Sequence, residues 1–158
     1  MTAPLLETHD LVKVYERNGI ECSLTEGAGC CGAPFLHSGD LDRFNKIAAD
    51  NVKALAATVR KGLDIVVPQP TCGYVLKKDY VDYVGNDDSR LVAEHTYDAV
   101  EYLMKLHKAE GTALDTEFNG EVPATVTYHT PCHLKAQNIG LKSRDLIKLT
   151  GAKVKVVQ

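Results

Sequence analysis

Apolar residues recur at helical spacing in several stretches of the chain. From Asp40 onward they step by three and four positions, which predicts one face of a long amphipathic helix that ends near Gly62. The apolar positions on that face are Leu41, Phe44, Ala48, Val52, Leu55 and Val59. Further predicted helices cover residues 4–18, 73–84, 89–108 (with Asp88 or Ser89 as its N-terminal cap) and 139–149.

Short runs of β-branched and apolar residues lie between these helices. One such run, residues 63–67, stops at Pro68 and Pro70, which cannot donate a hydrogen bond to a neighbouring strand. The predicted strands cover residues 20–24, 63–67, 124–128 and 153–157. The alternation of helix and strand predicts a layered α/β/α fold with a mainly parallel sheet.

A short stretch of the sequence occurs twice. Residues 10–14 and 145–149 match closely, and each is followed by a glycine and a predicted strand. We interpret residues 1–158 as a single domain built from two pseudo-repeats, of which the second is truncated. The first covers about residues 4–110 and the second begins in about residues 124–158.

Composition narrows the class of protein. Apolar residues make up 44% of the 158 positions, charged residues make up 25%, and the net charge is −3. These values are ordinary for a soluble globular protein. A negative net charge gives no positive electrostatic field that would attract nucleic acid. No basic and apolar leader begins the sequence, and no apolar run approaches the ~18 residues that span a bilayer. We therefore expect a cytoplasmic domain.

The five cysteines carry the candidate chemistry. Their odd number excludes a complete internal disulfide framework. Cys30 and Cys31 are adjacent and lie between Gly29 and Gly32, so the backbone can fold until both sulfurs face one centre. A metal or redox site explains this arrangement better than packing does. Cys22, inside a predicted strand, is instead expected to be a small buried side chain.

Cys72 and Cys132 each follow a predicted strand and precede a helix. A helix N-terminus favours the thiolate, which is the form that ligates metals. Sites in parallel α/β sheets gather at the carboxyl ends of the strands. We therefore expect Cys30, Cys31, Cys72 and Cys132 to gather at one edge of the sheet.

Two histidines flank Cys132, so a zinc site is an alternative to be considered. His129 and His133 could form a zinc site with the cysteine, although the spacing matches no familiar zinc knuckle. The other interpretation is that His129 orders the loop and that His133 lies in the first turn of the following helix. The sequence has no glycine-rich phosphate loop, so we expect no nucleotide.

Three motifs in order resemble a known family. They are Gly-Cys-Cys-Gly-Ala-Pro at 29–34, Pro-Thr-Cys at 70–72 and Tyr-His-Thr-Pro-Cys-His at 128–133. They are similar to the cysteine-rich CCG domain of heterodisulfide reductase B subunits and of glycolate-oxidase and lactate-utilisation iron–sulfur subunits. The last motif is most similar to that of the C subunit of anaerobic glycerol-3-phosphate dehydrogenase.

The resemblance implies a [4Fe–4S]-type cluster. Cys30, Cys31 and Cys72 would be ligands from the first repeat, and Cys132 would be the opening ligand of the second. The chain departs from the family pattern because only Cys22 precedes Cys30 and no second Cys-Cys-Gly follows Cys132. The chain therefore resembles a fragment of a longer subunit, in which the cluster is incomplete unless Cys132 contributes.

The resemblance also implies a function and partners. The module would accept electrons from a flavoprotein that oxidises glycerol 3-phosphate or a hydroxy acid. It would pass them through other iron–sulfur subunits toward a quinone or another acceptor, at the inner face of the membrane if its partners dock there. Two alternatives stay open: thiol–disulfide catalysis at Cys30 and Cys31, as in heterodisulfide reductase relatives, and a zinc-bound or metal-free scaffold.

Overall fold

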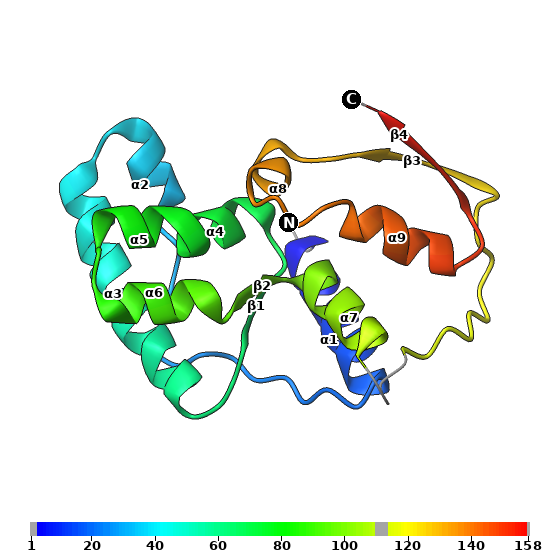
Figure 1. Cartoon of the computed structure of the whole chain (residues 1–158), viewed down its shortest axis with the longest axis horizontal. Helices are drawn as coiled ribbons and strands as arrows, with labels where there is room; N and C mark the ends of the chain where they lie inside the picture. The colour runs from blue at the N-terminus through cyan, green and yellow to red at the C-terminus, as the bar shows by residue number, and fades with distance from the viewer. Residues whose placement is uncertain (1–2, 110–113, 158) are drawn as a thin grey trace. The chain divides into compact units, whose positions relative to one another are not determined.

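The computed structural model describes residues 3–109 and 114–157 (Figure 1). The helical segments are α1 (Ala3–Arg17), α2 (Ala33–Ser38), α3 (Leu41–Arg60), α4 (Pro70–Tyr74), the π-helical η1 (Val75–Asp79), α5 (Tyr80–Tyr83), α6 (Asp87–Glu94), α7 (Ala99–Lys108), α8 (Cys132–Ala136) and α9 (Lys142–Leu149). The strands are β1 (Ile65–Val67), β2 (Thr96–Asp98), β3 (Thr125–His129) and β4 (Lys153–Val157).

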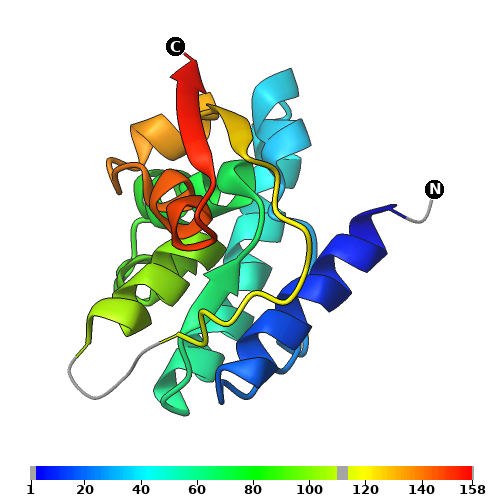
Figure 2. The ribbon, with the colours of Figure 1, turned by 90° about the vertical axis from the view of Figure 1, so that its right-hand side faces the viewer.

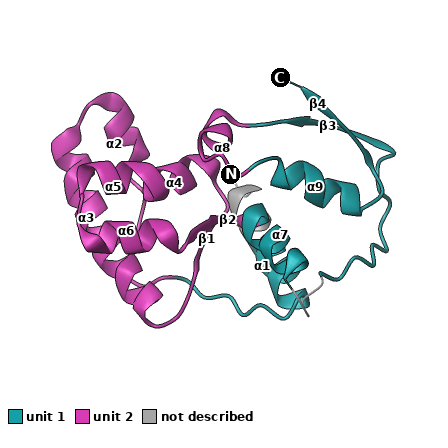
Figure 3. Cartoon of the chain, viewed as in Figure 1, with its two compact units in different colours: residues 1–24, 100–130, 140–158 teal, residues 25–99, 131–139 magenta. Residues whose placement is uncertain are grey.

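The chain divides into two compact units (Figure 3). Unit 1 comprises residues 1–24, 100–130 and 140–158, and unit 2 comprises residues 25–99 and 131–139. All four predicted site cysteines belong to unit 2, and Cys22 belongs to unit 1. The candidate chemistry can therefore be described within one unit.

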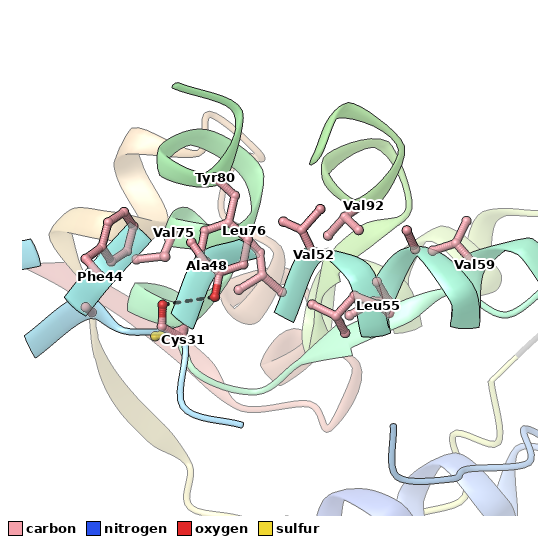
Figure 4. Packing of buried hydrophobic residues seen from close by; sticks show 13 residues of the cluster. Cys31, Phe44, Ala48, Val52, Leu55, Val59, Val75, Leu76, Tyr80 and Val92 are labelled. Carbon is pink, nitrogen blue, oxygen red and sulfur yellow. Dashed lines mark hydrogen bonds between the residues drawn. The ribbon is translucent and has the colours of Figure 1, made fainter. Parts of the chain in front are cut away.

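The long helix α3 supplies one wall of the core of unit 2. Its N-terminus is capped by Asp40, whose carboxylate accepts a hydrogen bond from the backbone N–H of Arg43 at 3.2 Å. The apolar face predicted from the sequence is buried from Phe44 to Val59, whereas Leu41 is 43% exposed. These side chains pack against others from η1, α5 and α6 in a single cluster (Figure 4).

A second run of helical segments packs into this core and carries Cys72. Segments α4, η1 and α5 follow one another without a break from Pro70 to Tyr83, which confirms the predicted helix but begins it earlier. Pro70 is well suited to the first helical position because it has no N–H to leave unpaired. The earlier start places Cys72 in the first turn.

The helix predicted over residues 89–108 is wrong as a single element. It divides into α6 and α7, with the strand β2 between them. The buried hydroxyl of Thr96 donates to the carbonyl of Val92 at 2.6 Å, and residues 96–98 pair in parallel with β1. The cap of α6 is Asn86, not Asp88 or Ser89, and its side chain accepts from the N–H of Ser89 at 2.8 Å.

Unit 1 contains α1, α9 and a second parallel pair of strands. Strands β3 and β4 run side by side in both views, from Thr125 opposite Lys153 to His129 opposite Val157 (Figures 1 and 2). The strand predicted over residues 20–24 is wrong, since this segment has no regular structure. The N–H of Ile20 instead donates to the carbonyl of Tyr15 at 3.0 Å and so completes the end of α1.

The α/β class and the parallel pairing of strands are confirmed. The strands in the described residues are distributed over two separate two-stranded sheets, β1–β2 in unit 2 and β3–β4 in unit 1. Within residues 3–109 and 114–157, every helix is too short or too polar to cross a bilayer.

Candidate metal centre

The Cys30–Cys31 pair lies in a turn that leads into α2. Gly32, the N-cap of that helix, has φ of +84°, a conformation that side chains rarely adopt. A Cβ at this position would lie 3.0 Å from the ring of Phe44 on α3. Glycine is therefore required both by the backbone and by the close approach of the turn to the core.

Two buried side chains bind the backbone of this turn. Asn51 of α3 accepts a hydrogen bond from the N–H of Gly29 at 2.9 Å and donates one to the carbonyl of Cys30 at 2.8 Å. The hydroxyl of Tyr80 donates to the carbonyl of Cys31 at 3.0 Å, as drawn in Figure 4. The turn is thus anchored to the core through its main chain.

Cys31 and Cys72 come together from distant parts of unit 2's sequence. Their sulfur atoms lie 3.2 Å apart, with the Cys31 thiol donating to the Cys72 sulfur. That hydrogen bond stabilises the Cys72 thiolate and lowers the pKa of Cys72 to about 7. The same hydrogen bond, together with burial, raises the pKa of Cys31. The hydrogen bond therefore favours ionisation of Cys72 and disfavours ionisation of Cys31.

Cys30 lies beside this pair but differs in exposure. Its side chain is exposed, whereas Cys31 is only 7% exposed. A negative charge on Cys30 would oppose ionisation of Cys72 and so works against the lowered pKa of Cys72. Cys30 is thus the solvent-facing member of the group.

Cys132 is placed by the docking of α8 on α4. It is the first residue of α8 and is exposed. The next side chain, His133, has its Nδ1 atom 3.0 Å from the hydroxyl oxygen of Thr71, the neighbour of Cys72. Gln137 donates to the carbonyl of Pro70 at 3.0 Å. These two contacts hold the start of α8 against the first turn of α4.

Polar side chains gather around the His133 ring. The ring lies 5.2 Å from that of Tyr74 and stacks on His37 of α2 at 6.0 Å. Burial and the charge of Asp82 raise the pKa of Asp79, while the two histidines partly oppose this. The interpretation that His133 lies in the first turn of a helix is confirmed.

Several expectations for the cysteines need correction. The turn of Cys30 and Cys31 follows an irregular segment, and Cys72 and Cys132 follow strands of different sheets, so no single sheet edge in the described residues gathers all four. The contact that is formed, between Cys31 and Cys72, joins the anchored turn before α2 to the first turn of α4. Cys22, expected to be buried in a strand, is exposed in the irregular segment.

The candidate ligands are of the chemical type that iron–sulfur clusters use, namely cysteine sulfurs. Thiolates are the ligands that such clusters use, and in the Cys31–Cys72 pair a thiol whose ionisation is favoured lies beside a second sulfur. Within the described ranges, no three Cys, His, Asp or Glu side chains form a group that could hold a single ion. The chain as described thus brings two sulfurs into contact, with Cys30 and Cys132 on elements next to them.

Asn51 is the site residue that the sequence pattern did not reveal. It is 5% exposed and lies between Ala48 and Val52 on the face of α3 that the periodicity assigned to the core. A polar residue at a core position needs hydrogen-bond partners, and here these are the backbone groups of the cysteine turn. An asparagine within an otherwise apolar stripe was the available signal.

The sequence of this chain is similar to those of known proteins. Residues 6–77 match the cysteine-rich domain CCG. The resemblance predicted from the motifs is confirmed. The matched segment contains Cys30, Cys31 and Cys72 and ends before Cys132. No solved structure matches the chain.

Curated relatives extend the similarity over most of the chain. The C subunit of anaerobic glycerol-3-phosphate dehydrogenase from Escherichia coli K12 is 29% identical over 88% of this chain and 34% of its own length. The B subunit of the CoM/CoB fumarate reductase from Methanothermobacter marburgensis is 30% identical over 87% and 24%. A probable glycolate oxidase iron–sulfur subunit from Bacillus subtilis is 26% identical over 93% and 33%. The chain thus spans about a quarter to a third of these relatives.

Proposed function

We propose that this chain is an iron–sulfur electron-transfer module of an oxidoreductase complex. Cys30, Cys31, Cys72 and Cys132 are its proposed cluster ligands. The observation that carries the proposal is the 3.2 Å approach of the Cys31 and Cys72 sulfurs, from the Gly-Cys-Cys-Gly-Ala-Pro and Pro-Thr-Cys motifs, inside unit 2. Thiols that separate parts of the chain bring side by side within one unit are placed to act together on one centre.

The proposed centre is of the [4Fe–4S] type, which supplies one-electron chemistry when bound. The protein's part is to hold the thiolates, to limit water and to set the local charge. Burial of Cys31 beside the apolar core serves the second purpose, and exposed Cys30 leaves one side open to a partner. Cys132, at the start of α8, would complete the ligand set.

The proposed electron donor is a flavoprotein dehydrogenase that oxidises glycerol 3-phosphate or a hydroxy acid. The names of the relatives support this, since they include subunits of a glycerol-3-phosphate dehydrogenase and a glycolate oxidase. Other iron–sulfur subunits would carry the electrons to a quinone or another acceptor. The proposed location is the cytoplasm, with attachment to the inner face of the membrane through those partners.

The domain assignment is likewise a proposal. The matching residues 10–14 and 145–149 fall in α1 and α9, both helices of unit 1, which supports two pseudo-repeats. The first helix leads to an irregular segment and the second to β4. The repeats therefore differ after their helices.

Anaerobic reconstitution tests the proposed function. The chain is incubated with iron and sulfide, desalted, and analysed for bound iron, bound sulfide and visible absorption. We expect Cys31→Ser and Cys72→Ser each to abolish about nine-tenths of the bound iron, since a cluster cannot keep its geometry without a thiolate ligand. Cys22→Ser is the matched control and should bind as the unmodified chain does. An unmodified chain without bound iron and sulfide would contradict the proposal.

Thiol–disulfide catalysis is a second candidate, favoured by the same short sulfur–sulfur distance. The pair that the structure joins is Cys31 and Cys72, rather than the adjacent Cys30 and Cys31. In such a reaction the two thiols would lose two electrons and two protons to form one disulfide, and an external disulfide would be reduced to two thiols. Reduction of about one equivalent of an added disulfide by the reduced, iron-free chain, lost in Cys72→Ser, would support this candidate.

A further inference from the structure

Asn51 and Tyr80 both bind the backbone of the cysteine turn from inside the core. We propose that they are positioning residues that fix the Cys30–Cys31 turn in the conformation that binds metal. This inference rests on the proposed function, because it concerns the same site. Neither side chain contacts the metal; each acts through the main chain of a ligand.

The contacts form one connected network. Asn51 accepts from Gly29 at 2.9 Å and donates to the carbonyl of Cys30 at 2.8 Å and to the hydroxyl of Tyr80 at 2.9 Å. Tyr80 donates its own proton to the carbonyl of Cys31 at 3.0 Å. Consecutive backbone groups of the turn are therefore bound by two side chains that also bind each other.

Burial makes this network strong and specific. Asn51 is 5% exposed and Tyr80 is fully buried. The two residues come from α3 and α5, helices whose buried side chains belong to the core cluster. A buried amide and phenol that lose their partners incur the full cost of desolvation, so the network holds only one arrangement of the turn.

The arrangement that it holds is the one in which the cysteine sulfurs meet. With the carbonyls of Cys30 and Cys31 bound toward the core, the turn enters α2 through Gly32 and the Cys31 sulfur lies 3.2 Å from that of Cys72. Loss of the network would free the two carbonyls and let the turn adopt other conformations. Metal affinity would then fall because the turn must be ordered again on binding.

The test uses isosteric removal of one hydroxyl, Tyr80→Phe, with Asn51→Ala as the second variant. The matched control is Thr96→Val, which also removes a buried hydroxyl bonded to a backbone carbonyl of unit 2, that of Val92. Cadmium ions serve as the thiolate probe and are titrated into the metal-free chain. Hydrogen exchange of residues 28–34 is measured by mass spectrometry on the same samples.

We expect Tyr80→Phe to weaken cadmium binding roughly tenfold and to accelerate exchange in residues 28–34 by a similar factor, while Thr96→Val changes neither. Asn51→Ala should show a larger effect in both. Exchange rates give a result even where a variant loses metal entirely. Unchanged cadmium affinity and exchange in Tyr80→Phe, or equal changes in Thr96→Val, would overturn the proposal.

The result is separable from the proposed function. An unmodified chain that takes up no iron and sulfide, but whose cadmium affinity still falls in Tyr80→Phe, would reject the iron–sulfur role and keep the positioning role. Failure of the unmodified chain to bind cadmium would overturn the positioning role as stated. Faster release of iron to a chelator from reconstituted Tyr80→Phe, with no change in Thr96→Val, would support both.

Discussion

At the scale of single residues, the site depends on positions where the backbone approaches the core. Gly32 follows the two cysteines and has a positive φ beneath the ring of Phe44. The motif glycine is therefore a structural requirement of this turn. Gly32 leaves room for the Phe44 ring because it has no side chain. Asn51, on α3, binds the polar backbone groups of the same turn.

Replacement of Gly32 tests this requirement. Gly32→Ala should lower the free energy of unfolding by about 2–3 kcal/mol, because a left-handed backbone and a close contact with Phe44 both oppose the added methyl group. Gly39→Ala is the matched control: its φ is +81° and a Cβ there would meet no atom within 4 Å. Gly39→Ala should lower the free energy of unfolding by only about 1 kcal/mol. Equal losses in urea unfolding of both variants would contradict the steric part of this argument.

Cys72 offers a pH-dependent measurement in the metal-free chain. The hydrogen bond from Cys31 lowers the pKa of Cys72 to about 7, so the thiolate should persist down to neutral pH. The rate of Cys72 alkylation by iodoacetamide should therefore rise through a midpoint near pH 7, because only the thiolate reacts. Cys31→Ala removes the donor and should move the midpoint to higher pH. A midpoint that stays in place in Cys31→Ala would show that Cys31 does not stabilise the thiolate.

At the scale of secondary structure, three of the four candidate cysteines lie at or next to helix N-termini. Cys72 is in the first turn of α4, Cys31 immediately precedes the N-cap of α2, and Cys132 begins α8. His133 joins these elements through contacts with Thr71, Tyr74 and His37. The position of Cys132 relative to Cys72 thus depends on how firmly α8 is docked.

His133→Ala should loosen that docking. We expect backbone amides of α8 to exchange with solvent roughly tenfold faster, since a hydrogen bond and two ring contacts are lost. His129→Ala is the control, because His129 is an exposed residue of β3 and also flanks the Cys132 motif. The measurement is hydrogen exchange followed by mass spectrometry. Unchanged exchange in α8 would show that Gln137 and apolar packing alone hold the helix.

At the scale of the whole molecule, each unit has its own sheet, and the cysteine site belongs to the one with α3 at its core. Val92 of α6 is fully buried in that core. Val92→Ala should lower the free energy of unfolding of unit 2 by about 2 kcal/mol, through lost burial and a residual cavity. Val14→Ala, at a 45% exposed helical position, should change stability by less than about 0.5 kcal/mol. Comparable losses in urea unfolding of the two variants would contradict the assigned core.

The sequence by itself determined much of this picture, because local rules were sufficient for it. Helical periodicity predicted α1 and α3, and β-branched runs bounded by turn residues predicted β1, β3 and β4. The cysteine motifs predicted the resemblance to the cysteine-rich domain CCG, which residues 6–77 match. Each of these signals depends on neighbours within a few positions, which a sequence shows directly.

Only the tertiary structure decided how the cysteines meet. The 3.2 Å contact between Cys31 and Cys72 joins residues 41 positions apart, and no local pattern encodes such a contact. The strand β2 exists because β1 offers it a partner, although its sequence continues a helical pattern. Asn51 likewise reads as one polar residue in an apolar stripe until packing brings the cysteine turn against it. Packing between distant parts of the chain, not local secondary-structure propensity, determines the cysteine contact, the strand β2 and the role of Asn51.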